Sequence, residues 1–246
     1  MSDYRFVIVG LGNVAWHLER MLLLAGIKPI LVHSAWNESH FSRDVFEPMD
    51  ESNCIVFLTV RDVGIASVAN RFQNAFLVHC SGSIPLRVLP ENRSAVLWPV
   101  QTFTRGVDMD YAGIPFILES GCDDLGGELS KIFSCISGKV ILMDSESRMK
   151  VHLAAVIAQN FSNRLIAEAD NILSGSGMDY TELLPLLSES LRKLYTVHPL
   201  EAQTGPAVRG DFDVLNSHLK RCAEDPGLKD LYQLISSRIN PNFSHE

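Results

Sequence analysis

The chain has 246 residues, of which 46% are hydrophobic and 20% are charged, as in ordinary globular proteins that form one large domain or two modest ones. Its formal net charge of −8 argues against nucleic acid or an anionic membrane surface as the main partner. No segment approaches the roughly 20 apolar residues that cross a bilayer, so we expect no membrane partner.

The five cysteines contain no Cys-x-x-Cys pair. An odd number of cysteines without such a pair suits reduced thiols, so we expect a cytoplasmic protein without a metal site. The first predicted strand begins near the N-terminus, and we therefore expect no targeting segment.

A strand, a glycine turn and a helix open the chain. Phe6 to Val9 are four consecutive apolar residues, as expected of a buried parallel strand, and apolar residues at helical spacing follow the glycines. Gly10 permits a tight turn, Gly12 lets the backbone approach a phosphate, and Ala15 allows close helix–strand packing. The pattern predicts that a dinucleotide pyrophosphate binds the N–H groups at the helix N-terminus, at Gly10, Gly12, Asn13 and Val14.

The second strand, predicted over residues 29–33, bears on the choice of cofactor. In an NAD-selective site, an Asp or Glu about 20 residues beyond the glycines holds the ribose 2′-OH. Here the first acid after the strand is Glu38. Because no carboxylate would repel a 2′-phosphate, we expect NADP, with NAD less favoured. The candidate phosphate contacts are Ser34, Asn37 and Arg43, although Arg43 also suits a solvated helix.

The third strand, predicted over residues 54–60, is an apolar run that ends at Arg61. In open α/β sheets, ligands bind beyond the carboxyl ends of the strands. We therefore expect Thr59, Val60 and Arg61 to border the cofactor. A helical crossover is predicted over residues 63–72.

The fourth strand, predicted over residues 76–79, ends in His79-Cys-Ser81-Gly82-Ser83. Polar and small side chains thus stand where chemistry would occur. We expect Ser81 to contact cofactor and substrate, and Gly82 to allow close approach of the substrate. Either serine could instead cap a following helix.

Three further strands are predicted over residues 95–99, 114–118 and 139–143, with a helix that begins near residue 126. Pro99 ends the first of these strands abruptly, so Gln101 is expected to face the region beyond the sheet edge.

After residue 145 only helical patterns occur, over residues 147–173, 180–197, 212–223 and 226–239. The sequence therefore predicts an α/β fold with a mainly parallel sheet in residues 1–145, followed by a smaller all-α domain in residues 146–246.

The predicted helix over residues 147–173 has no charged residue between Val151 and Asn163. One side is apolar and the opposite side carries His152, Gln159 and Asn163, with Asn160 about 80° away from His152. An uncharged polar side indicates a second buried contact, such as a cleft or a subunit interface. The alternative is a helix–helix contact in which these polar groups are satisfied.

The segment after the second predicted helix of this domain carries Arg209, which could bind a carboxylate or phosphate in a bidentate manner. Asp211 is expected to cap the next helix.

Taken together, the glycine turn and residues 79–82, 98–103, 152–155 and 204–211 resemble NADP oxidoreductases that join a Rossmann-like domain to a helical domain of unknown function. The layout is similar to pyrroline-5-carboxylate reductase, the deazaflavin-dependent NADP reductases and the 6-phosphogluconate dehydrogenase superfamily. The resemblance implies a homodimer formed by the helical domain. It also implies a substrate between cofactor and helical domain, with Ser81–Gly82 near the nicotinamide and His152, Asn160 and Asn163 across the cleft.

One departure limits what the resemblance implies. The hydroxyacid dehydrogenase branch has a catalytic Lys on this helix with an Asn one turn later, whereas here Lys150 is followed by Ala154. The reaction type is therefore not carried over from that branch.

We expect an NADP-dependent oxidoreductase that moves a hydride between nicotinamide and a small carbonyl, imine or deazaflavin-like substrate. His79 or His152 would exchange the proton, because imidazole titrates near neutrality. The alternatives are a non-catalytic NADP(H) sensor or interaction module, and a site for another nucleotide ligand such as S-adenosylmethionine. The expected substrate contacts are Ser81, Gly82, Gln101, Asn160, Asn163 and Arg209.

Overall fold

The computed structural model describes residues 4–32 and 51–243. The chain divides into two compact units, Met1–Ala158 and Gln159–Glu246. The domain boundary predicted at residue 145 falls at the end of the sheet, and the helix that begins there, α4 (Ser145–Ala155), belongs to the first unit.

The first unit contains a seven-stranded sheet with the strand order β2-β1-β3-β4-β5-β6-β7. All neighbouring strands are parallel except β5 and β6, which are antiparallel. The predicted mainly parallel α/β fold is confirmed, and each predicted strand lies within two residues of its observed ends. The strands are β1 (Arg5–Val9), β2 (Ile30–Val32), β3 (Cys54–Leu58), β4 (Phe76–His79), β5 (Ser94–Pro99), β6 (Phe116–Ser120) and β7 (Val140–Leu142).

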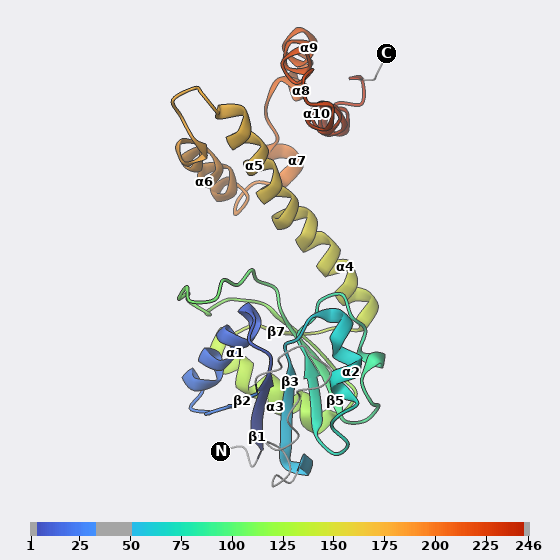
Figure 1. The fold of residues 1–246 in the computed structure, drawn as a ribbon. Helices are drawn as coiled ribbons and strands as arrows, with labels where there is room; N and C mark the ends of the chain where they lie inside the picture. Colours follow the sequence, from blue (N-terminus) through green and yellow to red (C-terminus); the bar gives the residue numbers. More distant parts are fainter. Residues whose placement is uncertain (1–3, 33–50, 244–246) are drawn as a thin grey trace. The chain divides into compact units, whose positions relative to one another are not determined.

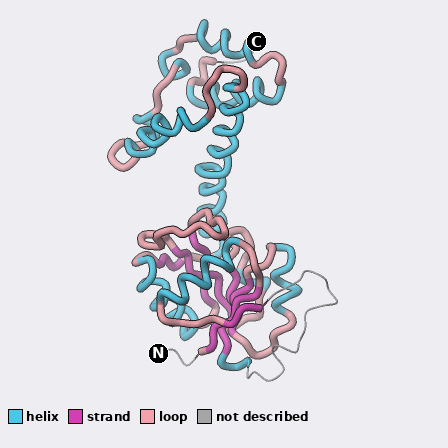
Figure 2. The backbone as a smooth tube through the Cα atoms, turned by 60° about the vertical axis from the view of Figure 1, so that its left-hand side comes forward, coloured by secondary structure: helices cyan, strands magenta, loops and turns pink. Residues whose placement is uncertain are grey.

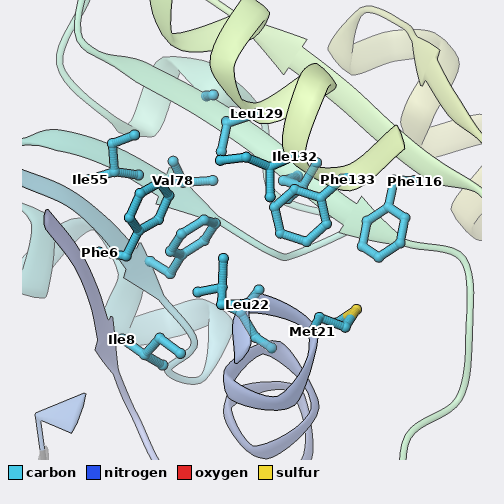
Figure 3. Packing of buried hydrophobic residues seen from close by; sticks show 14 of the residues in the cluster. Phe6, Ile8, Met21, Leu22, Ile55, Val78, Phe116, Leu129, Ile132 and Phe133 are labelled. Atoms are coloured by element: carbon cyan, nitrogen blue, oxygen red, sulfur yellow. The ribbon is translucent and has the colours of Figure 1, made fainter. Parts of the chain in front are cut away.

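Helices cover both faces of the sheet because alternate strand residues point to opposite faces. Phe6 and Ile8 of β1 pack with α1 (Asn13–Leu24) and α3 (Asp123–Ser137). Figure 1 labels the two helices, and Figure 3 shows the packed side chains. Val7 and Val9 belong to the core on the other face, with α2 (Ile65–Ala69). Short 3₁₀ turns complete this unit: η2 (Glu51–Asn53), η3 (Asp62–Gly64) and η4 (Leu86–Val88).

Helix α3 begins at Asp123 rather than near residue 126. Two aspartates occupy its first turn, where a negative charge favours the helix dipole. Gly126 lies inside the helix, and a Cβ at this position would lie 3.0 Å from the Cβ of Ser120. The glycine thus marks close packing of α3 on the end of β6, not the helix start.

The strand order places the ligand-binding edge of the sheet. Strands β2 and β3 lie on opposite sides of β1, so the direction of the chain's progress through the sheet reverses at β1. In open α/β sheets, ligands bind at this reversal, outside the carboxyl ends of the two strands concerned. Here those ends are the turns after β1 and β3.

The second unit is helical, and residues 159–243 contain no strand (Figure 2). The long helix predicted over residues 147–173 is present but not uniform. It changes from α4 to a π-helix, η5 (Val156–Phe161), and returns to α5 (Ser162–Leu173). The remaining helices are η6 (Tyr180–Leu183), α6 (Leu184–Lys193), α7 (Pro199–Ala202), α8 (Pro206–Arg209), α9 (Phe212–Arg221) and α10 (Pro226–Ile239).

Helix caps in this unit agree with the sequence only in part. Asp179 forms a capping box with Glu182, and the Asp225 carboxylate accepts a hydrogen bond from the Leu228 N–H at 3.0 Å. Asp211 is the N-cap residue of α9, as expected, but its side chain makes no capping bond to the helix. Its carboxylate instead accepts a hydrogen bond from Arg209 Nε at 2.8 Å.

Candidate functional site

The glycine turn after β1 requires Gly10. Its φ is +133°, and a Cβ at this position would lie 2.5 Å from Thr59 Oγ1 and 2.7 Å from the Thr59 carbonyl oxygen. The turns after β1 and β3 thus touch at the point where the strand order reverses.

Gly12 has a different role. Its φ of −73° suits any residue, and a Cβ there would meet no atom within 4 Å. Packing within the described chain therefore does not require glycine at this position. Gly12 is the N-cap of α1, no side chain caps the helix, and no acidic residue lies in its first turn. Open space beside uncapped N–H groups fits the pyrophosphate of a dinucleotide.

The turn after β3 contributes mainly backbone. Both the N–H and the Oγ1 of Thr59 donate to the Val9 carbonyl at 2.9 Å, so the hydroxyl serves to join the two strand ends. Val60 is half-buried and Arg61 is exposed. Of the three predicted residues, Arg61 therefore has the most accessible side chain.

The β5–β6 loop (residues 100–115) lies beside the glycine turn, and Figure 1 shows it in green next to α1. His17, buried on α1, holds this loop. Its Nε2 donates to the Thr104 carbonyl at 3.0 Å, its Nδ1 accepts from the Tyr111 hydroxyl at 2.9 Å, and its ring stacks on Phe103 at 4.4 Å. Because a carbonyl only accepts, these contacts assign the proton to Nε2. The sequence interpretation missed this contact.

His79, at the end of β4, is fully buried. Its Nδ1 accepts a hydrogen bond from the Ser81 N–H at 3.2 Å, and its Nε2 has no hydrogen-bond partner in the described chain. Burial, and secondarily the positive charge of Arg148, lowers the pKa of His79 to about 4. The imidazole is therefore neutral at pH 7 and fixes the turn that follows β4.

That turn is held by hydrogen bonds from both serines. Ser81 Oγ accepts from the N–H groups of Ser83 and Ile84, each at 3.2 Å. Ser83 Oγ donates to Asp62 at 2.7 Å, which joins the turn to η3. The alternative that either serine caps the following helix is wrong, since the N-cap of η4 is Pro85 and no side chain caps it. These hydroxyls order the turn itself.

Arg148, on α4, is completely buried and was not singled out from the sequence. Its guanidinium donates to the carbonyl oxygens of Ser81, Gly82 and Ile84 at 2.8 to 3.0 Å and pairs with Glu119 at 3.0 Å. Every edge of the guanidinium is thus occupied, and the turn after β4 is fixed to both α4 and β6. The signal in the sequence was an arginine one helical turn before His152.

His152 lies on the same side of α4 and covers Gly82 together with Trp98. The two rings are 5.4 Å apart, and a Cβ on Gly82 would lie 2.4 Å from His152 Cδ2 and 2.7 Å from Trp98 Cε2. Gly82 is therefore buried beneath the rings. His152 is half-exposed, and its nitrogens have no hydrogen-bond partner among the described residues. It is thus available for proton exchange, whereas His79 is not.

The first unit contains the glycine turn, the turns after β3 and β4, Trp98 and His152. Gln101 is exposed, and its side chain accepts from the Thr102 N–H at 2.9 Å. Asn160 and Asn163 are exposed residues of the second unit, as is Arg209, which pairs with Asp211. Ser34, Asn37 and Arg43 lie outside the described residues.

In residues 4–32 and 51–243, no group of three or more His, Cys, Asp or Glu side chains is placed to hold a metal ion. Over the same residues, no helix is both long enough and apolar enough to cross a bilayer.

Comparisons with known proteins agree with the fold. The chain is similar to a putative NADP oxidoreductase from Bacteroides fragilis, with 30% identity and a TM-score of 0.84 over 98% of this chain and 99% of that one. A Thermotoga maritima protein shares 26% identity, with a TM-score of 0.70 over 96% and 97% of the two chains. An Aspergillus terreus reductive aminase, crystallised with NADPH and ethyl-5-oxohexanoate, shares the fold at 13% identity, with a TM-score of 0.66 over 98% and 99%.

No curated protein sequence matches the chain. A family model described as a domain of unknown function, DUF2520, matches residues 114–239, which is just over half of the sequence. The predicted resemblance to Rossmann-like oxidoreductases with a helical domain of unknown function is confirmed. The chain belongs to the DUF2520 family.

Proposed function

We propose that this protein is an NADP-dependent oxidoreductase that transfers a hydride between nicotinamide and a small carbonyl, imine or deazaflavin-like substrate. The observation that carries the proposal is the pair Gly10 and Gly12 at the reversal of the strand order. Gly10 is required by the turn itself, whereas Gly12 leaves open space beside the uncapped N-terminus of α1.

The choice of NADP rests on two kinds of support. The Bacteroides fragilis relative is described as an NADP oxidoreductase, and the Aspergillus terreus reductive aminase of the same fold was crystallised with NADPH. In this chain no acid follows the second strand before Glu38. The N–H groups of Asn13 and Val14 would bind the pyrophosphate, and Arg61, Ser34, Asn37 and Arg43 are the candidate contacts to its other phosphate and ribose groups.

The bound nicotinamide supplies or accepts the hydride. We assign the accompanying proton exchange to His152, because its half-exposed ring has no hydrogen-bond partner in the described chain. His79 supports the turn after β4 through Ser81. Trp98, whose ring lies 5.4 Å from that of His152, suits a small substrate with an apolar part, and the exposed Gln101 is a proposed substrate contact in the same unit.

The same proposal includes a homodimer formed by the helical part of the chain, residues 146–246. Leu153, Ile157, Phe161 and Leu165 recur every fourth residue along the helix and are 60, 53, 56 and 39% exposed in the single chain. Water-exposed leucine, isoleucine and phenylalanine at helical spacing are typical of a surface covered in an assembly. Light scattering should give the mass of a dimer, and Phe161→Glu should shift it toward that of a monomer.

Binding and turnover test the proposal in two steps. Adding the protein to NADPH should change the NADPH fluorescence until binding saturates, and NADPH should raise the Tm of the protein. If neither NADPH nor NADH gives such a response, the proposal is overturned. Absorbance at the reduced nicotinamide band, with ketoacids, imines and deazaflavins as substrates, then separates an enzyme from a sensor that binds without turnover. His152→Gln should abolish turnover while NADPH still binds, whereas the control His198→Gln, in the second unit, should keep both.

A further inference from the structure

Arg105, in the β5–β6 loop, is held at the glycine turn by two contacts that the sequence interpretation did not foresee. Its guanidinium NH1 donates to the carbonyl oxygen of Leu11, the residue between the two glycines, at 3.1 Å. Its backbone N–H donates to the side-chain oxygen of Asn13, the first residue of α1, at 3.2 Å. Both ends of Arg105 are therefore fixed to the segment that carries the proposed pyrophosphate site.

The loop that carries Arg105 is itself attached to α1 on either side. Buried His17 contacts Phe103, Thr104 and Tyr111. Farther along the helix, Arg20 forms an ion pair with Asp108. Arg105 lies between these attachments in the sequence, so its position beside the turn is set by the packing of the loop and not by its own side chain alone.

The guanidinium keeps free hydrogen-bonding capacity. One of its nitrogens donates to Leu11, and no carboxylate pairs with it anywhere in residues 4–32 and 51–243. By contrast, Arg20 has a carboxylate partner, and Arg148 has every edge occupied. A guanidinium presents five N–H donors in a planar fork that matches two phosphate oxygens. Within the described part of the chain, Arg105 is thus an exposed cation without a carboxylate partner, next to a turn with no acid in the first turn of its helix.

We propose that Arg105 is a phosphate-binding residue of the dinucleotide site and that it contacts the pyrophosphate. This inference rests on the proposed function. It differs from the glycine-turn motif because the positive charge comes from a loop residue that lies 94 positions after Leu11 in the sequence. The Leu11 contact orients the fork while its remaining donors face the ligand.

The test is the affinity of the purified full-length chain for NADPH and for NADH, measured by fluorescence titration and calorimetry. Arg105→Ala should weaken both about tenfold or more, by a similar factor, since both cofactors contain the pyrophosphate. The affinities of Arg105→Lys should lie between those of the unaltered protein and those of Arg105→Ala, because lysine keeps the charge but lacks the planar fork of donors. Arg87→Ala, which removes an exposed arginine of η4, should leave both affinities unchanged.

The outcomes separate this inference from the proposed function. If the unaltered protein binds neither cofactor, both are overturned. If it binds them and Arg105→Ala binds equally well, only the role of Arg105 is overturned. A loss confined to NADPH would also overturn it, because Arg105 would then contact the 2′-phosphate. Equal Tm values without cofactor verify that the variants are folded.

Discussion

Two sets of strand ends in the same sheet use their polar groups in opposite ways. At the ends of β1 and β3, the glycine turn leaves the N–H groups of α1 uncapped and the space beside Gly12 open. At the ends of β4 and β6, Arg148 donates to three carbonyl oxygens of the turn after β4 and is itself paired with Glu119. The first arrangement leaves N–H donors free for a ligand, whereas in the second the carbonyl acceptors of the turn are used to hold it rigid. A binding site of this kind needs free donors for the ligand and also a rigid neighbouring turn, because rigid surroundings hold the reacting groups in place.

Removal of Arg148 should show the largest effect. Arg148→Met leaves three carbonyl oxygens and the Glu119 carboxylate without their buried partner, so the free energy of unfolding should fall by about 3–5 kcal/mol. Urea denaturation measures it. The matched control is Arg164→Met, which breaks an ion pair whose arginine is 69% exposed, and it should cost about 0.5 kcal/mol or less. Equal losses in the two variants would contradict the structural role of Arg148.

The two glycines of the turn should separate folding from binding. Gly10→Ala places a Cβ 2.5 Å from Thr59 Oγ1 at a φ of +133°, so we expect a loss of about 2–3 kcal/mol in unfolding free energy. Gly12→Ala meets no atom within 4 Å in the protein, and its stability should change by less than about 0.5 kcal/mol.

NADPH affinity is the second measurement on this pair. Gly12→Ala should bind NADPH at least about tenfold more weakly, because the methyl group would occupy the space next to the pyrophosphate. A Gly12→Ala variant that is destabilised as much as Gly10→Ala would show that Gly12 serves packing. Unchanged affinity would show that the open space is not the binding site.

The sequence predicted the sheet almost completely because buried strands are short apolar runs bounded by turn residues, as in Cys54–Leu58 and Phe76–His79. It also predicted the glycine turn, where local spacing carries the chemistry. It could not predict contacts set by tertiary packing. Arg105 reaches Leu11 across 94 residues, and Arg148 resembles any helical arginine until the fold surrounds it.

The same limit applied to the histidines and to the long helix. His79 and His152 look equivalent in sequence, yet one is fully buried and the other half-exposed. The π-helix Val156–Phe161 contains no proline or glycine, so nothing in its sequence marks it as an interruption of the α-helix.

The pH dependence of stability should be a smaller effect than the removal of Arg148, and it tests the turn after β4 through His79. Its pKa is about 4 in the folded protein, against an ordinary value of 6.5. Between these values the unfolded chain binds a proton that the folded chain excludes, so stability is lost as the pH falls. From pH 7 to pH 5 the free energy of unfolding should decrease by about 2 kcal/mol on account of this group.

Urea denaturation at pH 7, 6 and 5 measures this dependence, with His79→Gln as the comparison. Glutamine does not titrate, so the variant should lose the His79 contribution whatever its absolute stability at pH 7. The difference between the two slopes is the informative quantity, because His17, His152 and His218 remain in both proteins. Identical slopes would mean that His79 protonates as readily in the folded chain as in the unfolded one. That result would contradict the assignment of His79 as a buried, neutral imidazole whose Nδ1 accepts from the Ser81 N–H at 3.2 Å.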